Sequence, residues 1–227
     1  MKKIAVCLIT CLFITLSGCD KNQGNSNSLF NLKDELNTLA NSQVDGTIDL
    51  DPCYENNPFD EWGQAFFAGM TKFFQTTSES KKLSILDRND FEKILTLEIP
   101  EEYLNLDTIN VNMKNVELIG NEFISLFVQR NIFETLQLSK KMEDRLIQSK
   151  ILNVYDKSYL LKFVSLIRYS TYLSYTMNTK RVSYESCWKR KLQSVEDSGF
   201  FERVGCVIDW PMCLAKIAAD CVLEVYF

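Results

Sequence analysis

This chain of 227 residues contains no histidine, carries a formal net charge of −5 and is 46% hydrophobic. The lack of histidine excludes a Ser-His-Asp or Cys-His catalytic device, a histidine general base and a histidine-ligated zinc. Because there is no basic surplus to neutralise phosphates, we expect no nucleic-acid partner, and the eight glycines form none of the common nucleotide-binding patterns. The apolar fraction is sufficient for a globular core.

The first twenty residues have the plan of a secretory signal. Lys2 and Lys3 form a basic head, residues 4–16 are apolar apart from two threonines, and small residues lead to a cysteine. The apolar run is shorter than the roughly 20 residues that a helix needs to cross a bilayer. We therefore predict that residues 1–18 are a signal peptide that is removed.

The end of this signal, Leu16-Ser17-Gly18-Cys19, resembles the lipobox of bacterial lipoprotein precursors, and the resemblance is confined to residues 1–20. It implies that Cys19 receives a diacylglyceryl group and becomes the lipidated first residue of the mature chain. Burial of each lipid methylene contributes about 0.8 kcal/mol, so acyl chains such as palmitate would hold the domain on a membrane without a transmembrane span. The expected location is the bacterial cell envelope, facing the periplasm or the exterior.

The mature chain is predicted to begin with a flexible tether and to continue as one globular domain. Residues 19–27 are polar and rich in asparagine, as in a linker, and residues 28–227 are assigned to the domain. Ser28 is a candidate N-cap for a first amphipathic helix. Its apolar residues recur at helical spacing, namely Leu29, Leu32, Leu36 and Leu39.

A second, aromatic helix follows a loop over residues 44–57. Asn57 and Pro58 supply a cap and a first-turn proline, and Asp60 and Glu61 lie where acids complement the helix dipole. The predicted core face of this helix consists of Phe59, Trp62, Phe66, Met70 and Phe73.

The rest of the chain is predicted to be mainly helical, with no internal repeat. Expected helices are 80–86 and 90–97, ended by Pro100, then one from 114 that includes Arg130 and Phe133, and others near 139–152, 157–177, 184–198 and from 209 to the end. Near-alternation in 104–113 allows a brief strand. We expect an all-α, irregular bundle of about six to eight helices with a disulfide-stapled C-terminal helix.

Two acidic stretches are candidate sites. The run 45–51 could offer oxygen ligands to calcium, but it lacks the acid pattern and closing glutamate of an EF-hand loop, so we interpret it as a solvated loop with no metal. Asp60-Glu61-Trp62 pairs acids with an aromatic, as glycan-hydrolysing sites do. The alternative, which we prefer, is that the acids serve the helix N-terminus and the tryptophan faces the core.

A local basic patch, formed by Lys180-Arg181 and Lys189-Arg190-Lys191, stands out in an acidic chain. It could contact anionic headgroups or an acidic partner, although a solvated helix face is the preferred interpretation.

Five cysteines follow Cys19 and can oxidise outside the cytoplasm, namely Cys53, Cys187, Cys206, Cys213 and Cys221. Cys213 and Cys221 would lie about 12 Å apart on one helix, beyond disulfide reach. Among the last four of these cysteines, two pairings with two disulfide bonds remain: Cys187–Cys213 with Cys206–Cys221, or Cys187–Cys221 with Cys206–Cys213. Each bridge would contribute roughly 2–4 kcal/mol, and an all-cysteine zinc site is the less favoured rival.

The sequence therefore favours a non-catalytic envelope lipoprotein that binds another protein or a small ligand, with no cofactor and no catalytic residue assigned. A sharper version is an immunity-type lipoprotein that intercepts a toxin at the membrane. The alternative from another class is a carboxylate-dependent glycan hydrolase, which would require two carboxylates in a cleft within roughly 5–10 Å.

Overall fold

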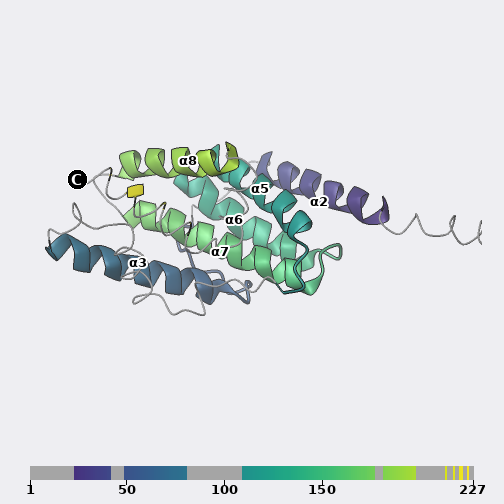
Figure 1. Ribbon diagram of the computed structural model, residues 1–227, viewed down its shortest axis with the longest axis horizontal. Coiled ribbons are helices and arrows are strands. Elements are labelled where there is room, and N and C mark those ends of the chain that lie inside the picture. Colours follow the sequence, from purple (N-terminus) through teal and green to yellow (C-terminus); the bar gives the residue numbers. More distant parts are fainter. Residues whose placement is uncertain are drawn as a thin grey trace, which may run out of the picture.

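The described secondary structure of the computed structural model is entirely helical (Figure 1). The structure describes residues 23–41, 49–80, 109–176 and 181–197, together with five helical positions, 213, 217, 220, 221 and 224. Six helices have both ends in these ranges: α2 (Gln23–Asn41), α3 (Asp60–Ser80), α5 (Met113–Val128), α6 (Ile132–Gln148), α7 (Val154–Thr176) and α8 (Arg181–Asp197). The all-α prediction is confirmed. The signal peptide, Cys19, Cys206 and the helices expected at 81–86 and 90–97 lie outside the described residues.

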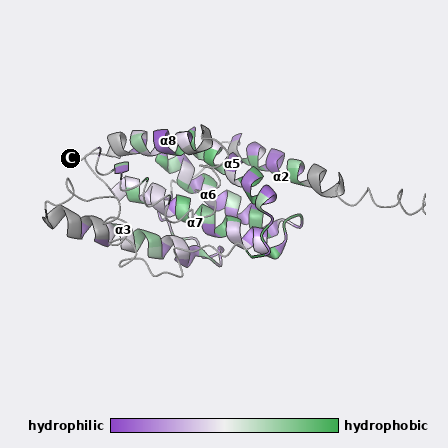
Figure 2. Ribbon diagram, viewed as in Figure 1, coloured by the Kyte–Doolittle hydropathy of each residue, from purple (hydrophilic) through white to green (hydrophobic). Residues whose placement is uncertain are grey.

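Helix α7 is the centre of the bundle. It packs against α3, α5, α6 and α8, and its side chains are buried on every side between Tyr159 and Thr171. A helix buried all round must lie inside a layer of other helices, whereas the outer helices need only one apolar face. Figure 2 accordingly shows hydrophobic and hydrophilic segments alternating along the described helices.

Helix α2 has the predicted core face but a different start. Leu29, Leu32 and Leu36 are buried as expected, whereas the helix begins at Gln23, so the predicted tether is helical over residues 23–27 and Ser28 is not its N-cap. Once the leucine face is packed, each residue added to the existing helix gains a hydrogen bond without a new nucleation step, which favours extension into a polar segment.

Salt bridges join α2 to two neighbouring helices. Lys33 pairs with Glu122 of α5, and Glu35 pairs with Arg145 of α6. These contacts are partly exposed, so they contribute to the alignment of α2 more than to stability.

Helix α3 confirms the predicted aromatic face, with Trp62, Phe66 and Met70 buried against the core. The predicted cap and first-turn proline, Asn57 and Pro58, precede the helix, which begins at Asp60. Asn57 Oδ1 accepts a hydrogen bond from the backbone N–H of Phe59 at 2.9 Å, within the turn that leads into α3. Gly63 allows close approach to α7, where its N–H donates to Oγ of Ser165 at 3.1 Å.

The possible strand is wrong for the described part of its range. Residues 109–112 form a turn, with Asn110 in the left-handed region at φ 66°, and α5 begins at Met113. Asparagine tolerates this conformation better than most residues because its short polar side chain can bond locally.

The helix predicted to include Arg130 and Phe133 is in fact two helices. Helix α5 ends at Val128, and Asn131 starts α6 through a capping box. Asn131 Oδ1 accepts from the Glu134 N–H, while a Glu134 carboxylate oxygen accepts from the Asn131 N–H. This reciprocal pair satisfies two donors of the first turn, so the chain starts a new helix there.

Helix α8 carries the C-terminal staple. A disulfide joins Cys187 to Cys221, which is one bond of the second predicted scheme and excludes the Cys187–Cys213 bond of the first. Cys213 is also disulfide-bonded, to a partner outside the described residues. Two ion pairs flank the staple, Arg190 with Glu224 and Lys191 with Asp220. Asp220, Cys221 and Glu224 of the C-terminal segment therefore face α8.

Candidate functional site

The main cluster of charged side chains among the described residues lies inside the bundle, where α3, α6 and α7 meet. Arg168 of α7 is fully buried, and its Nη2 donates to Oδ1 of Asp60 on α3 at 2.5 Å and to Oε1 of Glu143 on α6 at 2.9 Å. Glu143 is also fully buried and Asp60 nearly so. One guanidinium nitrogen thus joins three helices, and we call these three residues the Arg168 cluster.

Asp60 receives three further hydrogen bonds on its second carboxylate oxygen. The hydroxyl of Tyr169 donates to Oδ2 at 3.0 Å, Nε2 of Gln64 at 2.9 Å, and the backbone N–H of Tyr54 at 3.3 Å. Charge-assisted hydrogen bonds of this kind offset the cost of removing a carboxylate from water. Asp60 is therefore fully engaged by protein groups.

The loop before α3 is tied into the same cluster by Asn57. Its Nδ2 donates to Oε1 of Glu143 at 2.7 Å and to the carbonyl of Leu161 at 3.1 Å. Asn57 is itself buried, and its two hydrogen bonds fix the loop against α6 and α7.

Burial and charge shift the pKa values of the cluster in different directions. Burial alone would raise the pKa of Asp60, but Arg168 and the hydrogen bond from Gln64 outweigh it and hold that pKa below its ordinary value. Burial raises the pKa of Glu143 to about 7, although Arg168 and Asn57 act against the rise. Burial would lower the pKa of Arg168, but the two carboxylates raise it, so the guanidinium stays charged.

These directions describe a neutral buried unit. Charged Arg168 and charged Asp60 balance each other, and a protonated Glu143 adds no further charge below its pKa. Within the described part of the chain, Oε2 of Glu143 and the Nε and Nη1 groups of Arg168 have no hydrogen-bond partner. A proton on Oε2 is the state in which an unpartnered carboxyl oxygen costs least in a dry interior.

The predicted Asp60-Glu61-Trp62 site is not formed as an acid pair. Asp60 is buried, Glu61 is exposed and Trp62 is buried, so the two neighbouring carboxylates point to different environments. Asp60 is paired instead with Arg168, which also bonds Glu143, and neither of these two residues was singled out from the sequence. The available signal was an arginine in the middle of the apolar run 159–173.

The other acidic candidate also has protein partners where it is described. Asp49 pairs with Lys140 of α6 at 2.6 Å and accepts from the Asp51 N–H, while Asp51 accepts from the Cys53 N–H. The two bonds from backbone N–H groups are local turn interactions, whereas the Lys140 pair ties the segment to α6. Residues 45–48 lie outside the described ranges. In the described residues no group of acids, cysteines or histidines could hold a metal.

The basic residues 189–191 are paired within the molecule. Lys189 pairs with Glu185 at 2.9 Å on the same helix, and Arg190 and Lys191 pair with acids of the terminal segment. These contacts offset the local positive charge. The side chains of Lys180 and Arg181 are not among those described.

Cys53 is the free, exposed thiol of the described chain. Partial desolvation of this otherwise exposed thiol raises its pKa above the ordinary value, and the nearby Asp60 and Asp51 carboxylates raise it further. A raised pKa keeps a thiol protonated, which is the opposite of what a nucleophilic cysteine needs.

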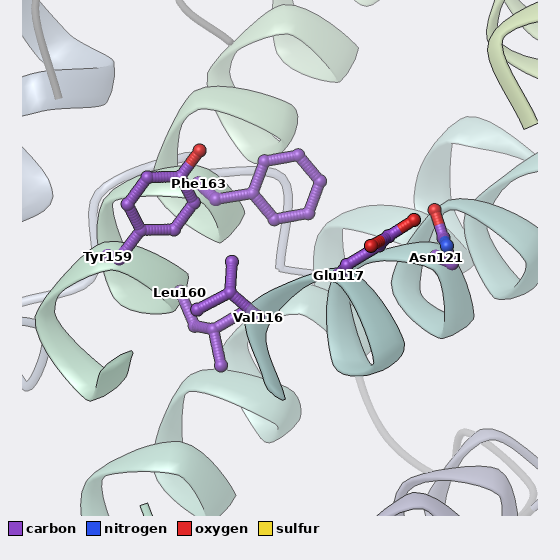
Figure 3. A pocket seen from close by; sticks show the side chains of 7 residues that line it. Val116, Glu117, Asn121, Tyr159, Leu160 and Phe163 are labelled. Carbon is purple, nitrogen blue, oxygen red and sulfur yellow. The ribbon is translucent and has the colours of Figure 1, made fainter. Parts of the chain in front are cut away.

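Two small recesses are lined by described residues alone. One lies between α5 and α7, where side chains including Val116, Leu160 and Phe163 fill the floor and Glu117 and Asn121 stand on the α5 side (Figure 3). It encloses about 200 Å³ including open solvent and has no room for a water molecule. A second recess beside α8, lined by Thr171 and Trp188 among others, encloses about 290 Å³ on the same basis.

Among the described helices, none combines the length and the hydropathy that a membrane-spanning segment requires. Comparison of the chain with protein-family models, curated proteins and solved structures found no match.

Proposed function

We propose that this protein is a bacterial envelope lipoprotein, anchored through Cys19, whose helical domain is a non-catalytic interaction module. The lipid anchor is supported by the sequence Leu16-Ser17-Gly18-Cys19, which directly follows a basic head and a short apolar run. Helix α2 starts at Gln23, so the folded domain would begin four positions after the lipid.

The Arg168 cluster supports a non-catalytic domain. A glycan hydrolase needs two carboxylates on opposite sides of a cleft that admits substrate. Asp60 and Glu143 do lie close together, because both accept from the same nitrogen, but their side chains are only 8% and 0% exposed. Carboxylates enclosed in this way hold helices together and have no room for a sugar ring between them.

The two recesses that lie among the described residues suit a protein contact better than an enclosed small molecule. Small-ligand pockets typically enclose about 300–1,000 Å³ and surround most of the ligand. The two recesses described above are smaller than this even with their open mouths included. A protein partner needs only a complementary surface.

The anchor is tested by expression in a bacterium supplied with an alkyne analogue of palmitate. The native chain should be labelled and should be found in the membrane fraction, whereas Cys19→Ser should be unlabelled and retain residues 1–18. Cys53→Ser is the matched control and should be labelled like the native chain. Equal labelling of the native chain and Cys19→Ser would refute the anchor.

The non-catalytic assignment has its own test. The purified domain should be inactive on glycan, ester and peptide substrates. Activity that disappears in Asp60→Asn, while the circular dichroism spectrum and melting temperature stay unchanged, would overturn the interaction-module assignment in favour of a carboxylate-dependent hydrolase.

A further inference from the structure

Two loops meet at one end of the bundle and are held together by a buried aspartate. Asp156, in the first turn of α7, accepts from the Asn112 N–H at 2.7 Å and from Nδ2 of Asn115 at 3.1 Å. Asn153 Oδ1 accepts from the Asp156 N–H at 2.8 Å. The segments 109–114 and 148–155 therefore lie beside each other, and we call them the loop end.

The loop end exposes apolar side chains to an unusual degree. Ile109 is 71% exposed, Val154 is 66% exposed and Tyr155 is 49% exposed. Of the four exposed large hydrophobic residues in the described chain, these are three, and the fourth is Phe30 of α2. Exposed apolar residues scattered singly need no explanation, whereas neighbouring ones are typical of interaction surfaces. Val154 and Tyr155 are adjacent in sequence, and the bond from Asn112 to Asp156 brings the segment of Ile109 beside them.

The charge of the loop end is opposite to that of the whole chain. Its two segments contain no aspartate or glutamate, while Lys114 and Lys150 are both exposed. Asp156, which directly follows the second segment, is buried with both carboxylate oxygens engaged. A surface that combines lysines with exposed aliphatic and tyrosine side chains suits the boundary between anionic headgroups and acyl chains.

The position of the loop end also points to a membrane. In Figure 1 the Gln23 end of α2 and the loops that precede α5 and α7 lie toward the same end of the long axis. Four residue steps separate Cys19 from Gln23, and an extended chain of that length spans at most about 14 Å. A lipid on Cys19 would therefore place the bilayer at this end of the molecule.

We propose that the loop end rests on the anionic surface of the membrane that holds the lipid anchor. This inference depends on the proposed lipidation of Cys19. Val154 and Ile109 enter the headgroup layer, Tyr155 lies at the level of the headgroups, and Lys114 and Lys150 face lipid phosphates. The domain then has one fixed orientation on the membrane, with the disulfide-stapled end of α8 turned away.

The test uses the full-length lipoprotein in vesicles of phosphatidylglycerol and phosphatidylethanolamine. An environment-sensitive fluorophore is attached to Val154→Cys, in a Cys53→Ser background that removes the exposed native thiol. The control places the same fluorophore at Thr176→Cys, an exposed position at the other end of the same helix. The probe at 154 should shift to shorter emission wavelength and be quenched by nitroxide lipids, and the probe at 176 should show neither change.

The outcomes separate the two proposals. If the protein stays in the vesicles but the probe at 154 remains in water, the loop-end inference is wrong while the lipid anchor stands. If the protein is not retained because Cys19 carries no lipid, the proposed function fails, and the inference that depends on it fails as well. Equal quenching at 154 and 176 would also contradict the fixed orientation.

Discussion

At the scale of single residues, Arg168 determines how three helices meet. Its Nη2 contacts Asp60 and Glu143, and its guanidinium carbon lies 5.3 Å from the ring centre of Tyr169 and 5.8 Å from that of Tyr54. A buried ion pair is not in itself strong evidence of stability, because desolvation offsets its attraction. Its removal, however, would leave the buried Asp60 carboxylate without its counter-charge and would take one of two hydrogen-bond donors from Glu143.

We therefore predict that Arg168→Met lowers the free energy of unfolding by about 3–5 kcal/mol, because it leaves the Asp60 carboxylate buried without its counter-charge. Arg190→Met is the matched control. It also removes an arginine from an ion pair, but that pair is exposed, so little or no change is expected. Urea unfolding monitored by circular dichroism measures both. Equal effects of the two substitutions would contradict the role of the Arg168 cluster.

The second residue-scale prediction concerns pH. The pKa of Glu143 is about 7 in the folded protein against an ordinary 4.5, so between these values the folded state holds a proton that the unfolded state has released. Its contribution to the unfolding free energy therefore falls as pH rises from about 4.5 to 7.

We predict that the native chain loses stability relative to Glu143→Gln as pH increases over this window, by on the order of 1–3 kcal/mol. Asp60 and Arg168 do not titrate there, since their pKa values are shifted below and above it. Urea unfolding of both proteins at several pH values is the measurement. A difference that does not change with pH would show that Glu143 titrates normally.

The sequence predicted which face of a helix is buried better than it predicted which polar residues bond one helix to another. The core positions of α2 and α3 follow from apolar residues at three- and four-residue steps, which is a local property. The Arg168 cluster joins residues separated by 25 and 108 positions, and no local pattern links them. An arginine in an apolar helix indicates that partners exist but does not identify them.

At the scale of elements, the approach of α3 to α7 depends on one glycine. A Cβ added at Gly63 would collide with the side chains of Tyr169 and Ser165 and would lie 2.8 Å from the Ser165 carbonyl oxygen. A Cβ added at Gly120 of α5 would meet nothing within 4 Å. Two helical glycines thus have opposite packing environments.

Substitution by alanine should therefore have opposite effects at the two positions. Gly120→Ala should stabilise the protein by about 0.5–1 kcal/mol, because alanine favours the helix more than glycine does. Gly63→Ala should destabilise it by about 1–3 kcal/mol, because α3 must move away from α7. Thermal melting of the two variants checks this, and a stabilising Gly63→Ala would mean that α3 does not lie so close.

The boundaries between elements were the weakest part of the sequence reasoning. Asn131 and Glu134 form a capping-box pattern that marks the start of α6. The helical spacing of residues before Arg130, however, is continued by Phe133, so the boundary between α5 and α6 was not recognised. The start of α2 was not readable, because residues 23–27 are polar and their helical state depends on the packing of the leucines that follow.

The Cys187–Cys221 bond makes a further element-scale prediction. It closes a loop of 34 residues, for which chain-entropy arguments give a stabilisation of about 4 kcal/mol. Cys187→Ala should lower the melting temperature by several degrees, whereas Cys53→Ser should leave it unchanged because Cys53 is free and exposed. Non-reducing peptide mapping should recover the 187–221 pair and, by the second scheme, a Cys206–Cys213 pair. Free thiols at 187 and 221 in protein from the envelope would disprove the staple.

At the scale of the whole molecule, the two ends of the bundle differ. Figure 1 places the Gln23 end of α2 and the loop end together along the long axis. The C-terminal segment is fastened to α8 by the disulfide and its flanking ion pairs. The charged groups of the interior bond one another and join helices. If the loop end rests on a membrane as proposed, we expect a protein partner to bind the surface that remains accessible.

The central claim is that Cys19 is the lipidated first residue of the mature protein. Mass spectrometry of the N-terminal peptide from protein purified out of bacterial membranes tests it most directly. The account predicts a peptide that begins at Cys19 and carries the mass of a diacylglyceryl group on its sulfur. A peptide that begins elsewhere, or an unmodified Cys19 in the mature chain, would contradict it.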